Sequence, residues 1–190
     1  AMFQHLLVPT DGSPLSEAAV GKAIAFAKEA GARITAFYAK ASPPVERFVD
    51  GVPIDAEIVK NFQRMADEEA QRILDFVAIA CRQEGVPCAT VTMTSDAPYE
   101  GIIQTATEKG CDLIFMASHG RRGISALLLG SETMKVLTHS KIPVLVCRLG
   151  HADSFAVPAR FSWIPAFAGI TGVDQVTPPG PPRRALRRPA

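Results

Sequence analysis

Residues 113–131 read LIFMASHGRRGISALLLGS, and this stretch decides both the fold and the candidate site. It opens with the apolar run 113–116, passes through Gly120 and Gly130, and ends on Ser131, where a helix-like run begins. A glycine loop that leaves a buried strand and ends at a helix start can hold phosphate. Glycine lets backbone N–H groups approach an anion, and the helix start adds free donors. The stretch therefore predicts a strand, an anion-binding loop and a helix.

Apolar runs alternate with helix-like patterns on both sides of this stretch. Besides the strand at 113–116, the pattern predicts strands over residues 5–9, 34–39, 89–93 and 142–146. Helices are predicted over residues 13–30, 55–84, 98–109 and 131–140. Strands that alternate with helices through short connections form a parallel sheet covered on both faces. The predicted fold is α/β, a doubly wound open sheet of five mainly parallel strands, followed by an irregular C-terminal tail.

The candidate site is predicted to have two halves. The glycine loop and the helix start after it form one half-site, and a turn near the N-terminus forms the other. Ligands of such sheets bind beyond the carboxyl ends of the strands, where the strand order reverses. If strands 5–9 and 113–116 are neighbours there, the turn Pro9-Thr10-Asp11-Gly12-Ser13 faces the loop 117–131. Ser13 is a candidate helix cap, and Asp11 is either a ligand residue or the first residue of an Asx turn.

Pro143 indicates where the last strand lies. Proline has no N–H to donate within a sheet, so the run that begins at Ile142 and ends at Val146 is predicted at an edge. An apolar edge strand favours pairing with a second copy of itself, and we expect a homodimer through this strand.

The amino-acid composition argues against several classes of function. The chain has 190 residues, 47% hydrophobic and 21% charged, with a net charge of +1. The last 40 residues hold five Arg and two Asp, so residues 1–150 carry about −2, which argues against nucleic acid as a partner. Four scattered cysteines without CxxC spacing predict reduced thiols, with neither a zinc site nor a disulfide framework. No membrane-spanning run and no secretory signal are visible, and we expect a cytoplasmic protein without a membrane partner.

Residues 151–190 differ from the rest of the chain. They contain seven of the fifteen prolines and four closely spaced arginines near the end. We predict two parts, a domain over residues 1–150 and a Pro-rich, Arg-ended tail over 151–190 that is disordered or loosely docked.

With these elements in place, residues 2–148 resemble the universal stress protein family. Four stretches carry the resemblance, LVPTDGS at 7–13, DLIFMASHG at 112–120, LLGS at 128–131 and IPVLV at 142–146. The family's ATP-binding branch has Gly, two residues, Gly, nine residues, Gly, then Ser or Thr. Here Ala117 stands at the first glycine, and Gly120, Gly130 and Ser131 match. Alanine is tolerated at that position if its φ is negative and strained if its φ is positive.

The resemblance implies a Rossmann-like, adenine nucleotide alpha hydrolase-like fold that binds ATP, AMP or ADP, with or without Mg²⁺. Asp11 would accept hydrogen bonds from the ribose, Ala39 would face adenine, and Met116 and Ala117 would line the adenosine pocket. The implied site comprises Pro9, Thr10, Asp11, Ala39, Met116, Ala117, His119, Gly120, Arg121, Arg122, Gly123, Gly130, Ser131, Glu132 and Thr133. Ser131 is either a phosphate ligand or only a helix cap, and His119, Arg121 and Arg122 are either phosphate ligands or solvated loop residues.

Three functions remain open at the level of sequence. The first is an ATP-binding, dimeric sensor or switch in the stress response, with a protein partner that the sequence does not name. The second is a slow ATPase, although no GxxxxGK[ST] loop is present and we assign no catalytic residue and no metal ligand. The third is a nucleotide-free dimeric interaction module of the same family.

Overall fold

The computed structural model describes residues 2–43, 48–49, 52–53, 56–118 and 129–148. The tail at 151–190 and the segment 119–128 lie outside the described residues. In chain order the elements are β1 (His5–Pro9), α1 (Pro14–Ala30), β2 (Arg33–Lys40), β3 (Phe48–Val49), β4 (Val52–Pro53), α2 (Ala56–Gln83), β5 (Cys88–Thr94), α3 (Pro98–Glu108), β6 (Leu113–Ala117), α4 (Ser131–His139) and β7 (Val144–Cys147).

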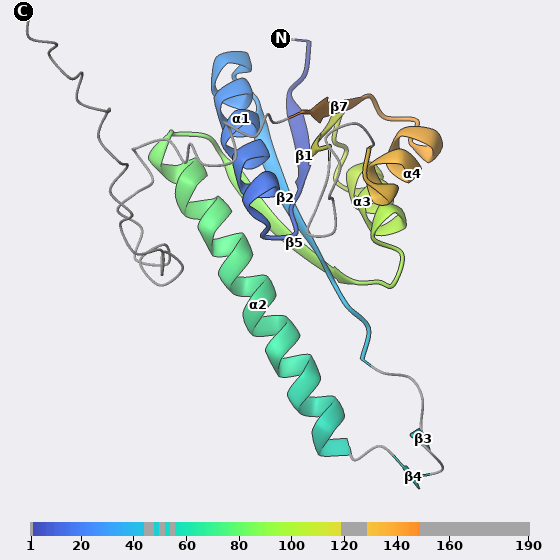
Figure 1. The fold of residues 1–190 in the computed structure, drawn as a ribbon. Coiled ribbons are helices and arrows are strands. Elements are labelled where there is room, and N and C mark those ends of the chain that lie inside the picture. Colours follow the sequence, from blue (N-terminus) through green and yellow to red (C-terminus); the bar gives the residue numbers. More distant parts are fainter. Residues whose placement is uncertain (1, 44–47, 50–51, 54–55, 119–128, 149–190) are drawn as a thin grey trace, which may run out of the picture. The chain divides into compact units, whose positions relative to one another are not determined.

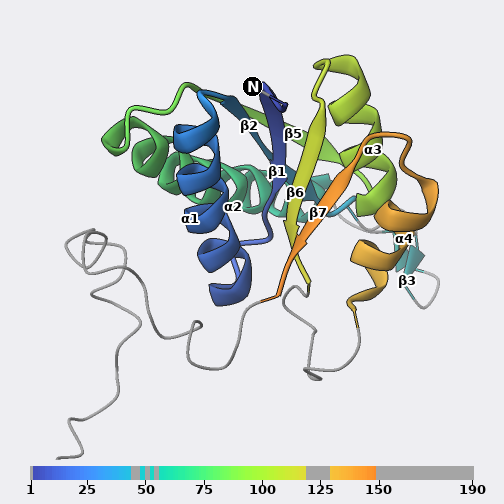
Figure 2. The same cartoon turned by 90° about the horizontal axis from the view of Figure 1, so that it is seen from above.

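Five strands form one sheet in the order β5-β2-β1-β6-β7, and every pairing within it is parallel. Helices α1 and α2 cover one face and α3 and α4 cover the other (Figures 1 and 2). After β1 the chain places β2 and then β5 on one side of it. It then crosses over and places β6 and β7 on the other side of β1. The expected doubly wound fold and the reversal between β1 and β6 are both confirmed.

Helix α1 begins and ends where its local sequence predicts. The Ser13 hydroxyl accepts a hydrogen bond from the Ser16 N–H at 3.2 Å, and Pro14 occupies the first helical position, where no N–H is needed. The helix ends at Gly31, whose φ of 64° is a conformation that glycine adopts without a steric penalty.

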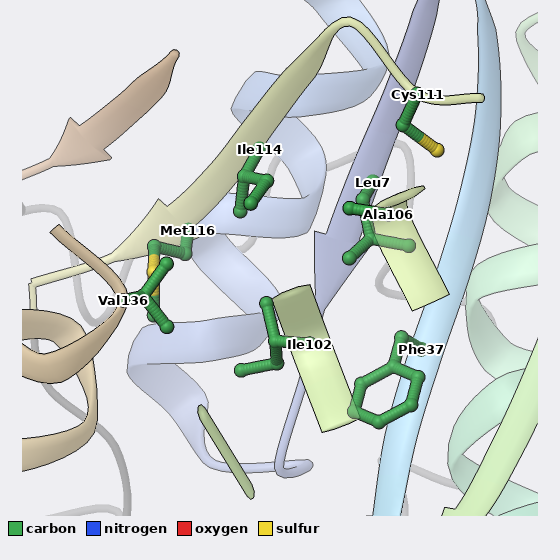
Figure 3. Close-up of a cluster of buried hydrophobic side chains, with 8 residues drawn as sticks. All are labelled: Leu7, Phe37, Ile102, Ala106, Cys111, Ile114, Met116 and Val136. Carbon is green, nitrogen blue, oxygen red and sulfur yellow. The ribbon is translucent and has the colours of Figure 1, made fainter. Parts of the chain in front are cut away.

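The core between the sheet and α3 and α4 is a compact apolar cluster (Figure 3). Its buried members are Leu7, Phe37, Ile102, Ala106, Cys111, Ile114, Met116 and Val136. They come from β1, β2 and β6 on one side and from the two helices on the other, with Cys111 just ahead of β6. On the opposite face of the sheet, the rings of Phe115 and Phe26 lie 6.1 Å apart between β6 and α1. Strands buried on both faces explain the continuous apolar runs of the sequence.

Helix α2 carries apolar residues at helical spacing from Ile58 to Ala80, and this apolar stripe is buried over only part of its length. Ala70, Ile73 and Val77 are buried, whereas Ile58 and Met65 are 58% and 64% exposed. A helix of 28 residues is about 42 Å long, but an eight-residue strand such as β2 spans only about 26 Å. The first half of α2 therefore extends past the carboxyl ends of the strands, where the sheet offers nothing to pack against (Figure 1).

Two further details differ from the sequence-based expectations. Residues 41–53, where the sequence analysis predicts neither a helix nor a strand, contain the short antiparallel pair β3–β4, whose two-residue strands are too short to leave a periodic signal. Strand β7 spans Val144–Cys147 rather than 142–146, because Pro143 precedes the strand and contributes only its carbonyl, which accepts the Ile114 N–H at 2.9 Å. The edge position of this strand is confirmed.

The close approach of α3 to β2 requires glycine at one position. A Cβ on Gly101 would lie 3.0 Å from the Phe37 ring and 3.2 Å from the Met93 sulfur, whereas a Cβ on Gly21 in α1 would meet nothing within 4 Å. We expect Gly101→Ala to destabilise the protein by about 1–2 kcal/mol through overpacking. Gly21→Ala should stabilise it by about 0.5–1 kcal/mol, the usual gain for alanine over glycine in a helix. Urea unfolding of both variants tests this pair, and equal stabilisation would contradict the packing at Gly101.

Candidate functional site

A cavity of about 1020 Å³ opens at the carboxyl ends of β1, β2 and β6. The two predicted half-sites both line it. Its walls include ten of the fifteen predicted site residues, namely Pro9, Thr10, Asp11, Ala39, Met116, Ala117, Gly130, Ser131, Glu132 and Thr133. The remaining five, His119, Gly120, Arg121, Arg122 and Gly123, lie outside the described residues.

The first half-site is a turn held by its own side chains. Asp11 Oδ1 accepts the Ser13 N–H at 3.0 Å, which is an Asx turn, and Thr10 Oγ1 accepts the Gly12 N–H at 3.2 Å. Gly12 has a φ of 71°, which favours glycine. The Thr10 N–H donates to the Phe37 carbonyl at 2.9 Å and so fixes the turn to β2.

The Asx-turn interpretation of Asp11 is confirmed, and its role as a ligand residue stays a prediction. Its carboxylate makes the Asx turn and also lies in the cavity wall. Thr10 is different, because its buried hydroxyl contacts Ser16 Oγ at 3.0 Å and serves the turn itself. The turn thus fixes the position of a carboxylate at the cavity before any ligand is present.

The second half-site is the start of α4. Gly130 is the N-cap, with φ −59° and ψ 150°, and its N–H donates to the Ser118 carbonyl at 2.8 Å. The N-cap interpretation of Ser131 is wrong, because Ser131 is the first helical residue and is exposed. Met134 makes the first intrahelical bond, to the Gly130 carbonyl at 3.0 Å. The amides of residues 131–133 precede it and have no intrahelical acceptor, which makes this end suited to an anion.

Two side chains at the start of α4 serve the fold. Thr133 Oγ1 donates to the Ala117 carbonyl at 3.1 Å and joins the helix to the end of β6. Glu132 Oε2 accepts the Tyr99 N–H at 2.9 Å, and its Oε1 accepts from Lys135 Nζ at 2.9 Å. Because α3 has no side-chain cap of its own, Glu132 supplies one from α4. The backbone of Glu132, rather than its carboxylate, is therefore the group suited to an anion.

Ala117 occupies the last position of β6, with its partner Cys147 in β7. Strand backbone has a negative φ, so alanine needs no strained conformation here. Met116 and Ala117 are 7% and 8% exposed and give the cavity an apolar wall. Ala39, half-buried near the end of β2, extends that wall.

Helix α2, mainly through its first half, supplies a cavity wall that the sequence analysis did not predict. Phe62, Met65, Ala66, Glu69 and Arg72 line the cavity. At the rim, Lys40 of β2 forms a 2.6 Å ion pair with Asp67 of α2. The available signal was the length of the apolar stripe, which exceeds the length of the strands beside it.

Glu17 has charged neighbours on both sides of its titration, Asp11 and Arg72. Burial raises the pKa of Glu17 on α1, and the neighbouring Asp11 charge raises it further, while Arg72 opposes both effects. Asp11 and Arg72 both act electrostatically on Glu17, in opposite directions. In the described part of the chain, no group of three or more His, Cys, Asp or Glu residues forms a metal-binding cluster.

A smaller cavity of about 430 Å³ lies at the opposite, amino edge of the sheet, lined by Gln4, His5, Gly31, Arg33, Gly110 and Asp112. The Asp112 carboxylate there accepts the N–H groups of Gln4 and His5 at 2.8 and 3.0 Å. This carboxylate holds the start of β1, and the sheet reversal directs ligand binding to the carboxyl edge instead.

The chain is similar in sequence to known proteins. A universal stress protein of Methanocaldococcus jannaschii, MJ0531, is 33% identical over 149 residues, which cover 77% of this chain and 83% of that protein. A universal stress protein of Thermus aquaticus is 33% identical over 147 residues, covering 77% of this chain and all of that one.

Solved structures show the same fold. MJ0577 of Methanocaldococcus jannaschii superposes with a TM-score of 0.67 at 25% identity, over 79% of this chain and 99% of that one. A universal stress protein in complex with cAMP superposes with a TM-score of 0.59 at 25% identity, over 79% and 100%. An Arabidopsis thaliana family protein with AMP bound shares the fold, with a TM-score of 0.57 at 15% identity over 79% and 94%.

Among the described residues, no helix combines the length and the apolarity that crossing a bilayer requires.

The family model for universal stress proteins matches residues 2–148, which include all five strands of the sheet and both half-sites. The chain therefore belongs to the universal stress protein family.

Proposed function

We propose that this protein binds an adenine nucleotide, ATP foremost, in the cavity at the carboxyl ends of β1, β2 and β6. One observation carries the proposal: the Pro9–Ser13 turn and the start of α4, distant in sequence, line the same cavity. One side offers a fixed carboxylate, and the other offers amides without intrahelical acceptors.

The two sides suit different parts of a nucleotide. A ribose presents hydroxyl donors, which the Asp11 carboxylate can accept. Phosphates carry negative charge, which the amides of residues 131–133 and the positive end of the α4 dipole favour. The apolar surface of Met116, Ala117 and Ala39 suits the adenosine end. His119, Gly120, Arg121, Arg122 and Gly123 complete the phosphate site in this proposal, as the family resemblance implies.

A relative supports the choice of ligand class. The universal stress protein solved with cAMP, 25% identical to this chain, has the same fold over 79% of it. Ala117, the departure from the ATP-binding pattern, lies in extended strand and so gives no backbone reason for losing the nucleotide. Binding, rather than catalysis, is the activity that the arrangement supports, and we assign the protein the role of a nucleotide-responsive switch in the stress response.

Isothermal titration with ATP tests the site. We expect saturable binding below 1 mM, with Asp11→Asn weakening it about tenfold, since a hydrogen bond to a charged group is worth roughly 1.5–3 kcal/mol. Asparagine keeps the oxygen that accepts the Ser13 N–H, so this variant retains the Asx turn while losing the charge at the cavity. Asp75→Asn, on the exposed side of α2, is the matched control and should bind as the wild type does.

Two results would count against the proposal. Wild-type protein that shows no saturable binding below 1 mM would favour the nucleotide-free interaction module. ATP turnover that scales with protein concentration and disappears in Asp11→Asn would instead favour the slow ATPase.

We also propose a homodimer through the edge strand β7. In the described part of the chain, β6 is the strand paired with β7. The Pro143 carbonyl accepts the Ile114 N–H of β6, and the Cys147 carbonyl accepts the N–H of Ser118, the residue after β6. In a parallel ladder the N–H groups of Val144 and Val146 therefore point toward the outer edge. Partly buried valines at those two positions suit pairing with another apolar strand.

Val146→Pro should convert the dimer to monomers in sedimentation velocity. Proline removes the outward N–H without adding charge and leaves the bonds to β6 in place. Val146→Thr keeps both the N–H and the branched shape and should remain dimeric. Val144 is unsuitable for this test because it packs against the core cluster. A dimer that persists in a folded Val146→Pro protein would exclude β7 as the interface.

A further inference from the structure

Strand β5 forms the second edge of the sheet, at the opposite side from β7. Within the described part of the chain, β2 is the only strand paired with β5, in a register that runs from Ile34–Cys88 to Lys40–Thr94. Strand β5 has seven residues, whereas β7 has four. The longer open edge of the sheet is therefore β5, and none of its residues lines the nucleotide cavity or takes part in the proposed dimer.

The hydrogen bonds at the two ends of β5 show which of its backbone groups face outward. The Pro87 carbonyl accepts the Ile34 N–H at 2.8 Å, and the Ser95 N–H donates to the Lys40 carbonyl at 3.0 Å. In a parallel ladder, residues that bond to a neighbouring strand alternate with residues whose backbone groups face away from it. The odd-numbered residues of β5 therefore bond to β2. The outward N–H and C=O groups belong to Cys88, Thr90, Thr92 and Thr94.

Strand β5 lacks the features that usually protect an edge strand from pairing. Its sequence, CATVTMT, contains neither a charged residue nor a proline, and its register with β2 has no bulge. Thr90 and Thr92 are exposed, and among the described residues none bonds to their outward backbone groups. A regular, uncharged edge of this kind pairs readily with another extended chain, whose backbone supplies donors and acceptors at the same spacing.

The two faces of β5 indicate which side chains such an extended chain would carry. Val91 and Met93 pack against the core cluster on the face covered by α3 and α4. Thr90 and Thr92 point to the opposite face, because side chains alternate along a strand. An added strand continues both faces, with apolar residues beside Val91 and Met93 and with polar or β-branched residues beside the threonines. The matching partner is an extended segment in which apolar and polar residues alternate.

We propose that β5 is a docking edge for an extended segment of a partner protein, which pairs with β5 and lengthens the sheet by one strand. A second copy of this chain is the less suitable occupant, a choice that rests on the proposed dimer, which places the second copy at β7. Two self-pairing edges on one sheet would join copy to copy in an open assembly that does not close. A segment of another protein ends the sheet instead.

A labelled peptide tests this edge directly. The probe is a fluorescein-labelled peptide of alternating threonine and valine with lysines at both ends, and fluorescence anisotropy should show saturable binding to the full chain. Thr92→Pro removes one outward N–H and leaves the bonds to β2 in place, so it should weaken binding about tenfold or more. Thr92→Val is the matched control, because it keeps the N–H and the branched shape, and it should bind within about twofold of the wild type.

Amide hydrogen exchange of the wild-type chain identifies the groups involved and does not depend on how the variants fold. Without peptide, the Thr90 and Thr92 amides should exchange faster than those of Ala89 and Val91, which donate to β2. Saturating peptide should slow the exchange of the Thr90 and Thr92 amides by about tenfold or more and leave Ala89 and Val91 slow.

Three results would overturn the proposal. The first is an absence of saturable peptide binding up to about 1 mM. The second is binding that persists unchanged in folded Thr92→Pro, or that leaves the exchange of the Thr90 and Thr92 amides unaltered. The third is protection of these two amides without peptide that grows with protein concentration, because a second copy would then occupy β5.

Discussion

The parallel pairing of β1 with β6 is the constraint on which the rest of the structure depends. These strands are about 100 residues apart in the chain, yet Leu6 stands beside Leu113 and Leu7 beside Ile114. The pairing reverses the strand order and sends α3 and α4 to the face opposite α1 and α2. It also brings the turn after β1 and the start of α4 to one cavity, which is the candidate site.

The cavity also depends on a mismatch of length. Helix α2 is longer than the strands that it covers, so its first half passes beyond the sheet and closes one side of the cavity. The apolar side chains of Phe62 and Met65 line the cavity together with polar side chains of the same helix, Glu69 and Arg72. An amphipathic ligand with an aromatic base, a sugar and phosphates matches such a mixed lining.

The sequence pattern predicted those strands and helix ends that are determined by a few neighbouring residues. The strand at 113–116, the Ser13 cap and the end of the first helix at residue 30 could all be predicted, because strand burial and helix termini each depend on few neighbouring residues. Interactions that join distant elements could not be predicted from local patterns, and the Glu132 carboxylate that caps α3 through the Tyr99 N–H is an example. The site residues themselves came from family resemblance, and the fold explains why ten of them line one cavity.

A crystal structure of the protein soaked with ATP and Mg²⁺ tests the central claim most directly. The account predicts one nucleotide in the carboxyl-edge cavity, with a ribose hydroxyl within hydrogen-bonding distance of the Asp11 carboxylate and phosphate oxygens at the amides of residues 131–133. An empty cavity at saturating ATP, or a nucleotide bound elsewhere, such as at the amino edge beside Arg33, would contradict it.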